Sequence, residues 1–486
     1  MDTELSTRYT RRALLKILGA GIAQSAQRTP SAPANIIFIM SDDHAAHAIS
    51  AYGSKINRTP NIDRIAQGGM RMLNCFCTNS ICTPSRGAIM TGQYSHISGV
   101  KTLADGLDGA RPNLAKYMRA AGYQTAMIGK WHLKNDPTGF DYWNILPGQG
   151  LYHNPEFIEM GRRKKHTGYC TDLIADFSLD WLRRRDPSKP FFLMCHHKAP
   201  HRPWQPGPKH ANLYEGVDIP EPDNLYDDYK NRSHAAANTK MRVGDDNNAV
   251  DLKVVRPVGL EGRELRKWAY QRYIKDYLRC VASVDDNVGR VLDYLDAERL
   301  SDNTLVVYTS DQGFFLGDHG YYDKRFMYEE SLRMPFLARL PGRVAPGSIN
   351  KDIVLNIDFA PTFLDLAGQR TPVEMQGRSF RSILNGRTPR DWRTSMYYRY
   401  WMHLADHHVP AHYGVRTSRY KLIYFYGKAL GSAGAIDKDT QPEWELFDLE
   451  KDPREMNNVY ADPAYRTVVK KLKATLEKHR RAYGDS

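Results

Sequence analysis

The chain has 486 residues, 41% of them hydrophobic and 25% charged, which is typical of a folded globular protein and excludes a wholly disordered, collagen-like or coiled-coil chain. A mean hydropathy of −0.58 excludes a polytopic membrane protein, and no apolar run approaches the roughly 20 residues of a spanning helix. Six cysteines are too few for a disulfide framework. The net charge of +13 favours an anionic partner, but no nucleic-acid-binding signature is present.

The N-terminal residues resemble an export signal. Arg11 and Arg12 begin the run R-R-A-L-L-K, which resembles the twin-arginine pattern, and a Gly/Ala-rich stretch follows over 17–26. Small residues up to Ala34 offer cleavage points. We therefore expect residues 1–34 to form a signal segment and the protein to be periplasmic or secreted. A short amphipathic helix or a tail is the alternative.

Apolar runs typical of buried strands alternate with helical periodicity along the next part of the chain. Strands are predicted over 35–40, 125–128, 190–195 and 304–309. Helices are predicted over 60–68, 113–121, 171–184, 268–295 and 357–367. This alternation predicts an α/β fold in which a large, mainly parallel central sheet is sandwiched by helices.

Two regions differ from this alternation. Residues 206–262 are polar and rich in Asn, Asp and Pro, and a segment of that length is usually functional or disordered. After about residue 371, Tyr-rich strands are predicted over 396–401, 413–417, 420–426 and 445–448, before a closing helix over 464–483. We therefore expect a large domain over 35–370 and a smaller α+β subdomain with an antiparallel sheet over 371–486.

Polar side chains follow each of the four predicted strands. In chain order they are Asp42 and Asp43, Lys130 and His132, His201, and Asp311 and Gln312. Ligands of open α/β sheets bind beyond the carboxyl ends of the strands, so we expect these groups to meet at one edge. Each pattern alone is more often a helix cap or a solvated group. Their joint occurrence predicts a site.

The chemistry of these groups is consistent with one ligand. Four of them offer hard oxygen atoms that suit Ca²⁺ or Mg²⁺ rather than zinc: Asp42, Asp43, Asp311 and the Gln312 carbonyl. Four others are cationic or donate protons: Lys130, His132, His201 and Lys324. A divalent cation surrounded by such groups favours a tetrahedral oxyanion, either phosphate or sulfate.

Cys82 is the candidate nucleophile. Pro84 stands where a helix is expected to begin, so Cys82 should lie just before a helix N-terminus, where a developing anion is favoured. Arg86 lies one turn further along. A buried structural cysteine beside a helix cap is the alternative, and spacing alone does not decide between them.

The run C-T-P-S-R-G-A-I-M-T-G over 82–92 resembles the sulfatase signature C-x-P-S-R-x-x-x-L-T-G, with Met90 in place of the usual leucine. Further stretches are similar to sulfatase segments in order and spacing: G-K-W-H at 129–132, A-P-H-R-P at 199–203, S-D-Q-G at 310–313, D-K at 323–324 and W-E-L-F-D-L at 444–449. The resemblance covers residues 35–460. Gln312 departs from it, because many sulfatases have Asn or His there, but Gln keeps a carbonyl.

The resemblance implies a mechanism. Cys82 would be oxidised by a maturation enzyme to Cα-formylglycine, whose hydrate attacks sulfur. Arg86 and Lys130 would hold this nucleophile anionic. Lys130, His201 and Lys324 would bind the sulfate, and His201 or Lys324 would protonate the leaving alcohol. His132 would take the proton that regenerates the aldehyde.

The resemblance also implies a metal centre. Its ligands would be Asp42, Asp43, residue 82, Asp311 and Gln312. The expected ion is Ca²⁺, with Mg²⁺ as the alternative.

The wider motifs most resemble bacterial N-acetylglucosamine-6-sulfatases and mucin- or glycosaminoglycan-desulfating enzymes, which implies a 6-O-sulfated glycan as substrate. The alternatives are an arylsulfatase or choline-sulfatase-like enzyme, a phosphonate or phosphate ester hydrolase on the same scaffold, and a non-catalytic anion-binding protein.

Two residues are candidates to read a sugar hydroxyl. Asp323 directly precedes Lys324, and His412 lies in a turn of the late region that could fold over the pocket mouth. The alternative is that Asp323 pairs with Arg325 and that His412 packs in the small subdomain's core.

Overall fold

The structure is a computed structural model that describes residues 33–485, and from Ala34 onward these residues form one compact unit. The predicted twin-arginine segment, with Arg11 and Arg12, lies outside the described residues. Among the helices that the structure describes, none combines the length and the apolar character needed to cross a membrane.

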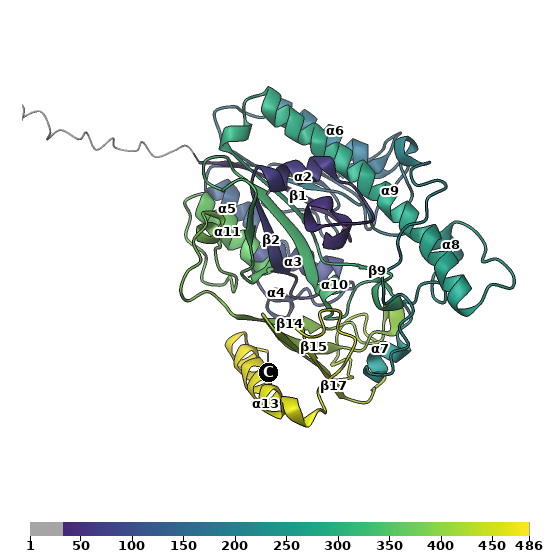
Figure 1. The fold of residues 1–486 in the computed structure, drawn as a ribbon. Coiled ribbons are helices and arrows are strands. Elements are labelled where there is room, and N and C mark those ends of the chain that lie inside the picture. Colours follow the sequence, from purple (N-terminus) through teal and green to yellow (C-terminus); the bar gives the residue numbers. More distant parts are fainter. Residues whose placement is uncertain (1–32, 486) are drawn as a thin grey trace, which may run out of the picture. The chain divides into compact units, whose positions relative to one another are not determined.

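A large sheet dominates this unit (Figure 1), with strand order β12-β2-β11-β8-β1-β7-β3-β4-β5-β6 and β13 also paired with β2. Its strands are β1 (Asn35–Ser41), β2 (Met70–Phe76), β3 (Gln124–Gly129), β4 (Tyr142–Ile145), β5 (Glu156–Glu159), β6 (Arg162–Lys165), β7 (Phe191–His196), β8 (Thr304–Ser310), β11 (Arg333–Arg339), β12 (Ser348–Asn350) and β13 (Val354–Leu355). The central run β8-β1-β7-β3-β4 is parallel throughout. The predicted mainly parallel sheet is confirmed.

Helices cover both faces of this sheet. The α-helices that the structure describes are α2 (Pro60–Gln67), α3 (Cys82–Thr91), α4 (Ser95–Ser98), α5 (Leu114–Ala120), α6 (Cys170–Arg184), α7 (His234–Asn238), α8 (Ala249–Leu252), α9 (Gly262–Ala297), α10 (Glu329–Leu332), α11 (Phe359–Leu366), α12 (Arg381–Leu384) and α13 (Arg466–Ala482). Helices α2, α6 and α9 pack together, and α3, α5 and α11 form a second group (Figure 1). Phe38 of β1 contacts the second group, with ring centroids 5.9 and 5.4 Å from Phe359 and Phe363.

The central strands are fully buried because helices cover both of their faces, which explains their unbroken apolar runs. By contrast, β2 and β11 were not predicted. In β2, buried positions are interrupted by half-buried ones such as Arg71 and Asn74, and the strand pairs antiparallel with β11 away from the central run. Its run M-R-M-L-N-C-F lacks the continuous apolar content by which the central strands were identified.

The late region forms a separate four-stranded antiparallel sheet, as predicted, with α13 packed against it. Its strands are β14 (Ser395–Tyr400), β15 (His412–Thr417), β16 (Tyr420–Phe425) and β17 (Glu443–Asp448). A buried ion cluster joins it to α10. The fully buried Lys421 of β16 lies 2.9 Å from Glu329 Oε1 and 2.6 Å from Glu455 Oε1.

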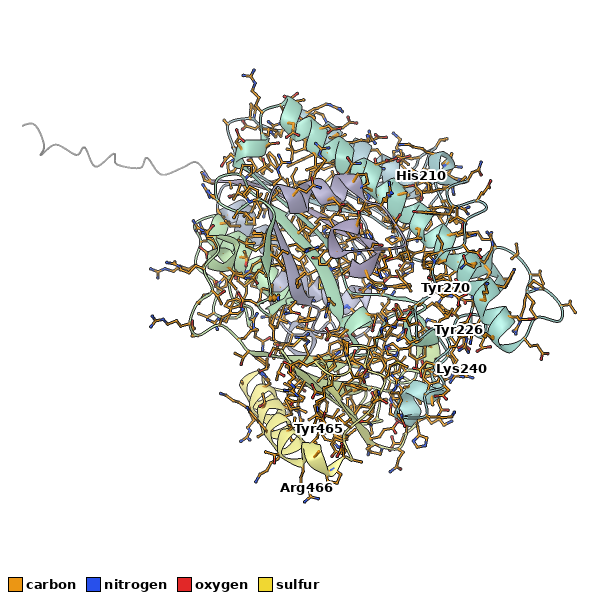
Figure 2. The ribbon with its side chains drawn as sticks, viewed as in Figure 1. His210, Tyr226, Lys240, Tyr270, Tyr465 and Arg466 are labelled. Atoms are coloured by element: carbon orange, nitrogen blue, oxygen red, sulfur yellow. The ribbon has the colours of Figure 1, made fainter. Side chains whose placement is uncertain are left out.

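The polar segment over 206–262 contains little regular structure beyond α7 and α8. Figure 2 shows Tyr226, Lys240 and Tyr270 on the side of the molecule where this segment lies beside α9. The Tyr270 hydroxyl of α9 donates to Pro220 O at 2.8 Å, and the Lys240 N–H donates to His407 O at 2.7 Å. The segment therefore connects α9 to the loop that precedes β15.

Gly129 ends β3 at a point where no side chain fits. Its φ is +104°, and an added Cβ would lie 2.0 Å from the carbonyl oxygen of His196 on the neighbouring strand. Lys130 follows directly, and its N–H donates to the same oxygen at 2.8 Å. Gly122 also has a positive φ, of +87°, but no atom lies within 4 Å of its added Cβ.

We expect Gly122→Ala to lower the free energy of unfolding by about 1–2 kcal/mol from backbone strain alone. Gly129→Ala should cost about 2 kcal/mol more, because the methyl group forces β3 away from β7. It should also lower turnover by displacing Lys130, which Gly122→Ala should not do. Urea unfolding and kinetics of both variants measure this, and equal destabilisation by the two would contradict the close approach.

Candidate active site

Polar groups gather beyond the carboxyl ends of β8, β1, β7 and β3, which are consecutive strands of the sheet. The groups that follow these strands are Asp311 and Gln312, Asp42 and Asp43, His201, and Lys130 and His132. Lys324 reaches them from outside the sheet, directly after the short hairpin of β9 (Phe315–Leu316) and β10 (Tyr322–Asp323). The structure thus brings together the six residues predicted to act on the oxyanion and the five predicted metal ligands.

Three carboxylates form the floor of this site. Oxygen atoms of Asp42, Asp43 and Asp311 lie within 4.8 Å of one another, and all three side chains are fully buried. Two further oxygens, Asp42 Oδ1 and Gln312 Oε1, are buried and accept no hydrogen bond from the described residues. Unsatisfied hard oxygens around buried carboxylates fit a hard divalent cation such as Ca²⁺ or Mg²⁺.

The three carboxylates titrate differently. Burial opposes the ionisation of Asp42, but the charges of Lys130, Arg86 and Lys324 outweigh it and hold the pKa of Asp42 well below its usual range. Burial, together with the negative charge of Asp42, raises the pKa of Asp43 to about 6 and that of Asp311 to about 7. A cation that binds here therefore displaces protons from Asp43 and Asp311 near neutral pH.

Three buried cations balance the carboxylates. Arg86 Nε lies 3.0 Å from Asp311 Oδ2, and Lys324 Nζ lies 2.7 Å from Asp43 Oδ1. Lys130 Nζ contacts Asp42 directly. All three basic side chains are almost completely buried. They therefore lie where they can stabilise negative charge on a bound oxyanion.

Cys82 is the first residue of α3, so the helix begins two residues before the position inferred from Pro84. Its side chain lines a cavity of about 290 Å³ together with His201 and Lys324. Burial raises the pKa of the Cys82 thiol to about 12. An unmodified thiol at this position is therefore protonated and a poor nucleophile at neutral pH.

The two predicted catalytic histidines are held as neutral rings. His201 Nδ1 lies 2.7 Å from the carbonyl oxygen of Arg202, so Nδ1 carries a hydrogen and Nε2 lies toward Asp43 Oδ2, 3.8 Å away. Burial and the charge of Lys130 hold the pKa of His201 well below its usual range. The same causes lower the pKa of His132 to about 2. Both rings are therefore neutral at physiological pH.

Charged side chains form the mouth of the cavity, and they include the predicted Asp323 together with Arg202, Arg325 and His407, to which the sequence assigned no role. Asp323 Oδ2 lies 3.0 Å from His407 Nε2, and Arg202 pairs with Asp251 of the 206–262 segment at 3.0 Å. Asp323 and Arg325 have φ of +82° and +94°. Such strain in non-glycine residues persists only where surrounding contacts fix it.

The structure does not place His412 at this mouth. Its ring is fully buried in the small sheet, with Nδ1 2.8 Å from the carbonyl oxygen of Pro410 and the ring stacked 5.6 Å from that of Tyr398. His407, five residues earlier, lines the cavity instead. The D-H-H run at 406–408 was the available signal, but its contact with Asp323 spans 84 residues.

Residues 34–369 match the sulfatase family, and residues 317–482 match the C-terminal region of N-sulphoglucosamine sulphohydrolase. The chain is 42% identical to an N-acetylglucosamine-6-O-sulfatase of Bacteroides thetaiotaomicron, over 97% of this chain and 91% of that protein. It is 28% identical to an arylsulfatase of Clostridium perfringens, over 91% and 94% of the two chains.

Solved structures give the same picture. One, described as a complex with its substrate D-glucosamine-2-N,6-O-disulfate, has a TM-score of 0.89 and 42% identity, covering 93% of this chain and 99% of that one. A phosphonate monoester hydrolase from Silicibacter pomeroyi has a TM-score of 0.72 at 22% identity, covering 93% and 96% of the two chains, and therefore shares the fold.

We expect Ca²⁺ to raise the Tm more at pH 8 than at pH 5. At pH 5 the folded protein holds protons on Asp43 and Asp311, which the cation must displace, whereas at pH 8 both are ionised. When the pH lies two units below the pKa of a carboxylate ligand, the apparent affinity for the cation is about 100-fold weaker. Tm measured in CaCl₂ and in EDTA at both pH values tests this.

Asp311→Asn should reduce the Ca²⁺-dependent gain in Tm. Asp285 provides a control, because it is also buried with a pKa raised to about 6, but it accepts hydrogen bonds from Asn61 and Ile62 at the start of α2. Asp285→Asn should leave the Ca²⁺-dependent gain in Tm unchanged. A gain that does not depend on pH, or zinc at full occupancy in the purified protein, would contradict the assignment.

Proposed function

Because this chain belongs to the sulfatase family, we propose that it hydrolyses the 6-O-sulfate ester of an N-acetylglucosamine-containing glycan. The family makes it a sulfuric ester hydrolase. The observation that carries the substrate is the 42% identity, over 97% of the chain, to an N-acetylglucosamine-6-O-sulfatase. The cavity of about 290 Å³ above the three carboxylates supports it, since a cavity of this size suits a single sulfated sugar.

We propose that residue 82 acts as Cα-formylglycine, in keeping with the family. We also propose that the bound metal is Ca²⁺, with Mg²⁺ as the alternative. When present, the hydrated aldehyde supplies the hydroxyl that attacks sulfur, and the cation acts as a Lewis acid on a sulfate oxygen. Asp42, Asp43, Asp311, Gln312 and residue 82 would hold the ion. The neutral Cys82 thiol, with its raised pKa, supports the need for this modification.

The residues around the oxyanion have distinct proposed roles. Arg86 and Lys130 stabilise the anionic nucleophile, while Lys130, His201 and Lys324 bind the sulfate oxygens. His201 or Lys324 gives a proton to the alcohol oxygen as the sulfur–oxygen bond breaks. Because His201 is neutral with its hydrogen on Nδ1, its Nε2 has no proton to give when the substrate first binds, whereas Lys324 is protonated. His132 would then accept the proton from the remaining hydroxyl of residue 82 while the carbon–oxygen bond to sulfate breaks, which releases sulfate and re-forms the aldehyde.

The cellular context is part of the proposal. The twin-arginine-like segment supports export to the periplasm or beyond, after a cytoplasmic maturation enzyme has modified Cys82. We keep residue 370 as the boundary between a catalytic domain and a C-terminal subdomain. The antiparallel sheet and α13 lie wholly in the second part.

A substrate panel tests the proposed function. The purified protein is assayed on 6-O-sulfated N-acetylglucosamine, an aryl sulfate, choline sulfate and a phosphonate monoester. Preferred turnover of the sugar is expected. Preference for the aryl sulfate or choline sulfate would indicate a small-molecule sulfatase. Preference for the phosphonate would indicate a phosphonate monoester hydrolase.

Cys82→Ala should reduce turnover by at least about 1,000-fold, because the nucleophile is lost. Mass spectrometry of the wild-type peptide that contains residue 82 should show the aldehyde rather than the thiol. Cys195→Ala, a change at another fully buried cysteine, in β7, is the control and should keep most activity. Appreciable activity of Cys82→Ala would exclude the formylglycine mechanism.

Asp323→Ala should lower kcat/KM on the sulfated sugar at least about tenfold more than on an aryl sulfate. If Asp323 accepts a hydrogen bond from a sugar hydroxyl, its removal should weaken binding of the sugar ester and leave the aryl ester, which has no such hydroxyl, much less affected. His412→Ala is the control, because its buried ring should affect stability and leave the ratio of the two substrates unchanged. Equal losses on both substrates for Asp323→Ala would remove Asp323 from sugar recognition.

A further inference from the structure

The loop between β4 and β5 brings into the sulfate pocket a glutamine that neither the motifs nor the resemblance assigned. Gln149 lies in the run P-G-Q-G over 147–150 and lines the same cavity as Cys82 and Lys324. Its Oε1 lies 2.5 Å from Lys130 Nζ. We infer that Gln149 is a positioning residue that orients the Lys130 ammonium and offers its own amide N–H to the bound oxyanion. This inference rests on the function proposed above.

The atom that faces Lys130 is fixed by chemistry. An ammonium group has three donors and no acceptor, so the contact must be made by the amide oxygen of Gln149. Gln149 lines the cavity, and its amide nitrogen has no hydrogen-bond partner among the described residues. An N–H group of a residue that lines the cavity is a donor available to an anion in the cavity.

The loop holds Gln149 from both sides. Before it, the Leu146 N–H donates at 3.0 Å to the carbonyl oxygen of Gly129, the residue next to Lys130. After it, the fully buried Tyr152 donates from its hydroxyl to the carbonyl oxygen of His201 at 2.5 Å. The loop that carries Gln149 is therefore hydrogen-bonded to the backbone next to Lys130 and to the backbone of His201. Lys130 and His201 are both proposed to bind the sulfate.

The neutral charge of glutamine matters here. Lys130 already contacts the Asp42 carboxylate, which draws the ammonium toward the acidic floor. With one N–H of Lys130 given to Asp42 and a second to the uncharged Gln149, the third is left for a ligand in the cavity and the positive charge stays intact. A carboxylate in the same place would cancel that charge and repel a sulfate ester.

Three variants test the inference. Gln149→Met keeps the approximate size of the side chain without its hydrogen bonds, and Gln149→Glu adds a carboxylate. Leu151→Ala, a change at a 63% exposed position of the same loop, is the control. The readouts are Tm, kcat and KM on an aryl sulfate and a sulfated sugar, and the Kd for inorganic sulfate by calorimetry.

Gln149→Met should lower kcat/KM on both esters by about 10- to 100-fold, the range expected for a hydrogen bond to a charged group. At pH 8, Gln149→Glu should lower kcat/KM more than Gln149→Met does, and it should bind sulfate more weakly than wild type. The kcat/KM and the sulfate affinity of Gln149→Glu should approach those of wild type as the pH falls, because the protonated carboxyl group resembles the amide. Leu151→Ala should match wild type.

The outcomes separate this inference from the proposed function. If wild type hydrolyses sulfate esters and both Gln149 variants match it, the positioning role is excluded and the function stands. If wild type hydrolyses no sulfate ester but Gln149→Glu still weakens sulfate binding, the role stands and the function fails. Equal loss at every pH with a lowered Tm would indicate a structural role only and overturn the inference.

Discussion

The site depends on a balance of buried charge at the ends of parallel strands. Three carboxylates are buried against three basic groups, which are Arg86, Lys130 and Lys324. Removing either set alone would leave uncompensated charge in the protein interior, which is strongly unfavourable. With the two sets balanced, a divalent cation makes the pocket positive, and an anionic ester lowers that positive charge. The same balance therefore favours metal and substrate together.

The fold enforces this balance through adjacent strands. Because β8, β1, β7 and β3 are neighbours in one parallel run, the residues that follow them emerge side by side at a single edge. Arg86 and Cys82 come from α3, and Lys324 comes from a segment whose neighbours contact the C-terminal part. Tyr398 of β14 donates to the carbonyl oxygen of Arg325 at 2.6 Å. The small sheet thus helps to fix one of the three cations.

The predictable parts of this structure are those set by local pattern. The four central strands are continuous apolar runs, so the sequence alone located them and the polar residues at their ends. His407 and His412 show the limit. Both lie in one polar stretch, and only the pairing of β15 with β14 and β16 buries His412 while the preceding loop carries His407 to Asp323. Gln149 and Asp251 likewise acquire partners that are distant in sequence.

This division has a chemical counterpart. The sulfate end of the cavity is built from residues that directly follow strands or begin α3, where register fixes each side chain. The other end of the cavity is built from short elements and the loops between them, where Asp323 of β10 meets His407 and Arg202 meets Asp251 of α8. Loops tolerate substitution and insertion better than buried strands. One catalytic centre can therefore serve different sulfate esters, as the proposed role of Asp323 in sugar recognition requires.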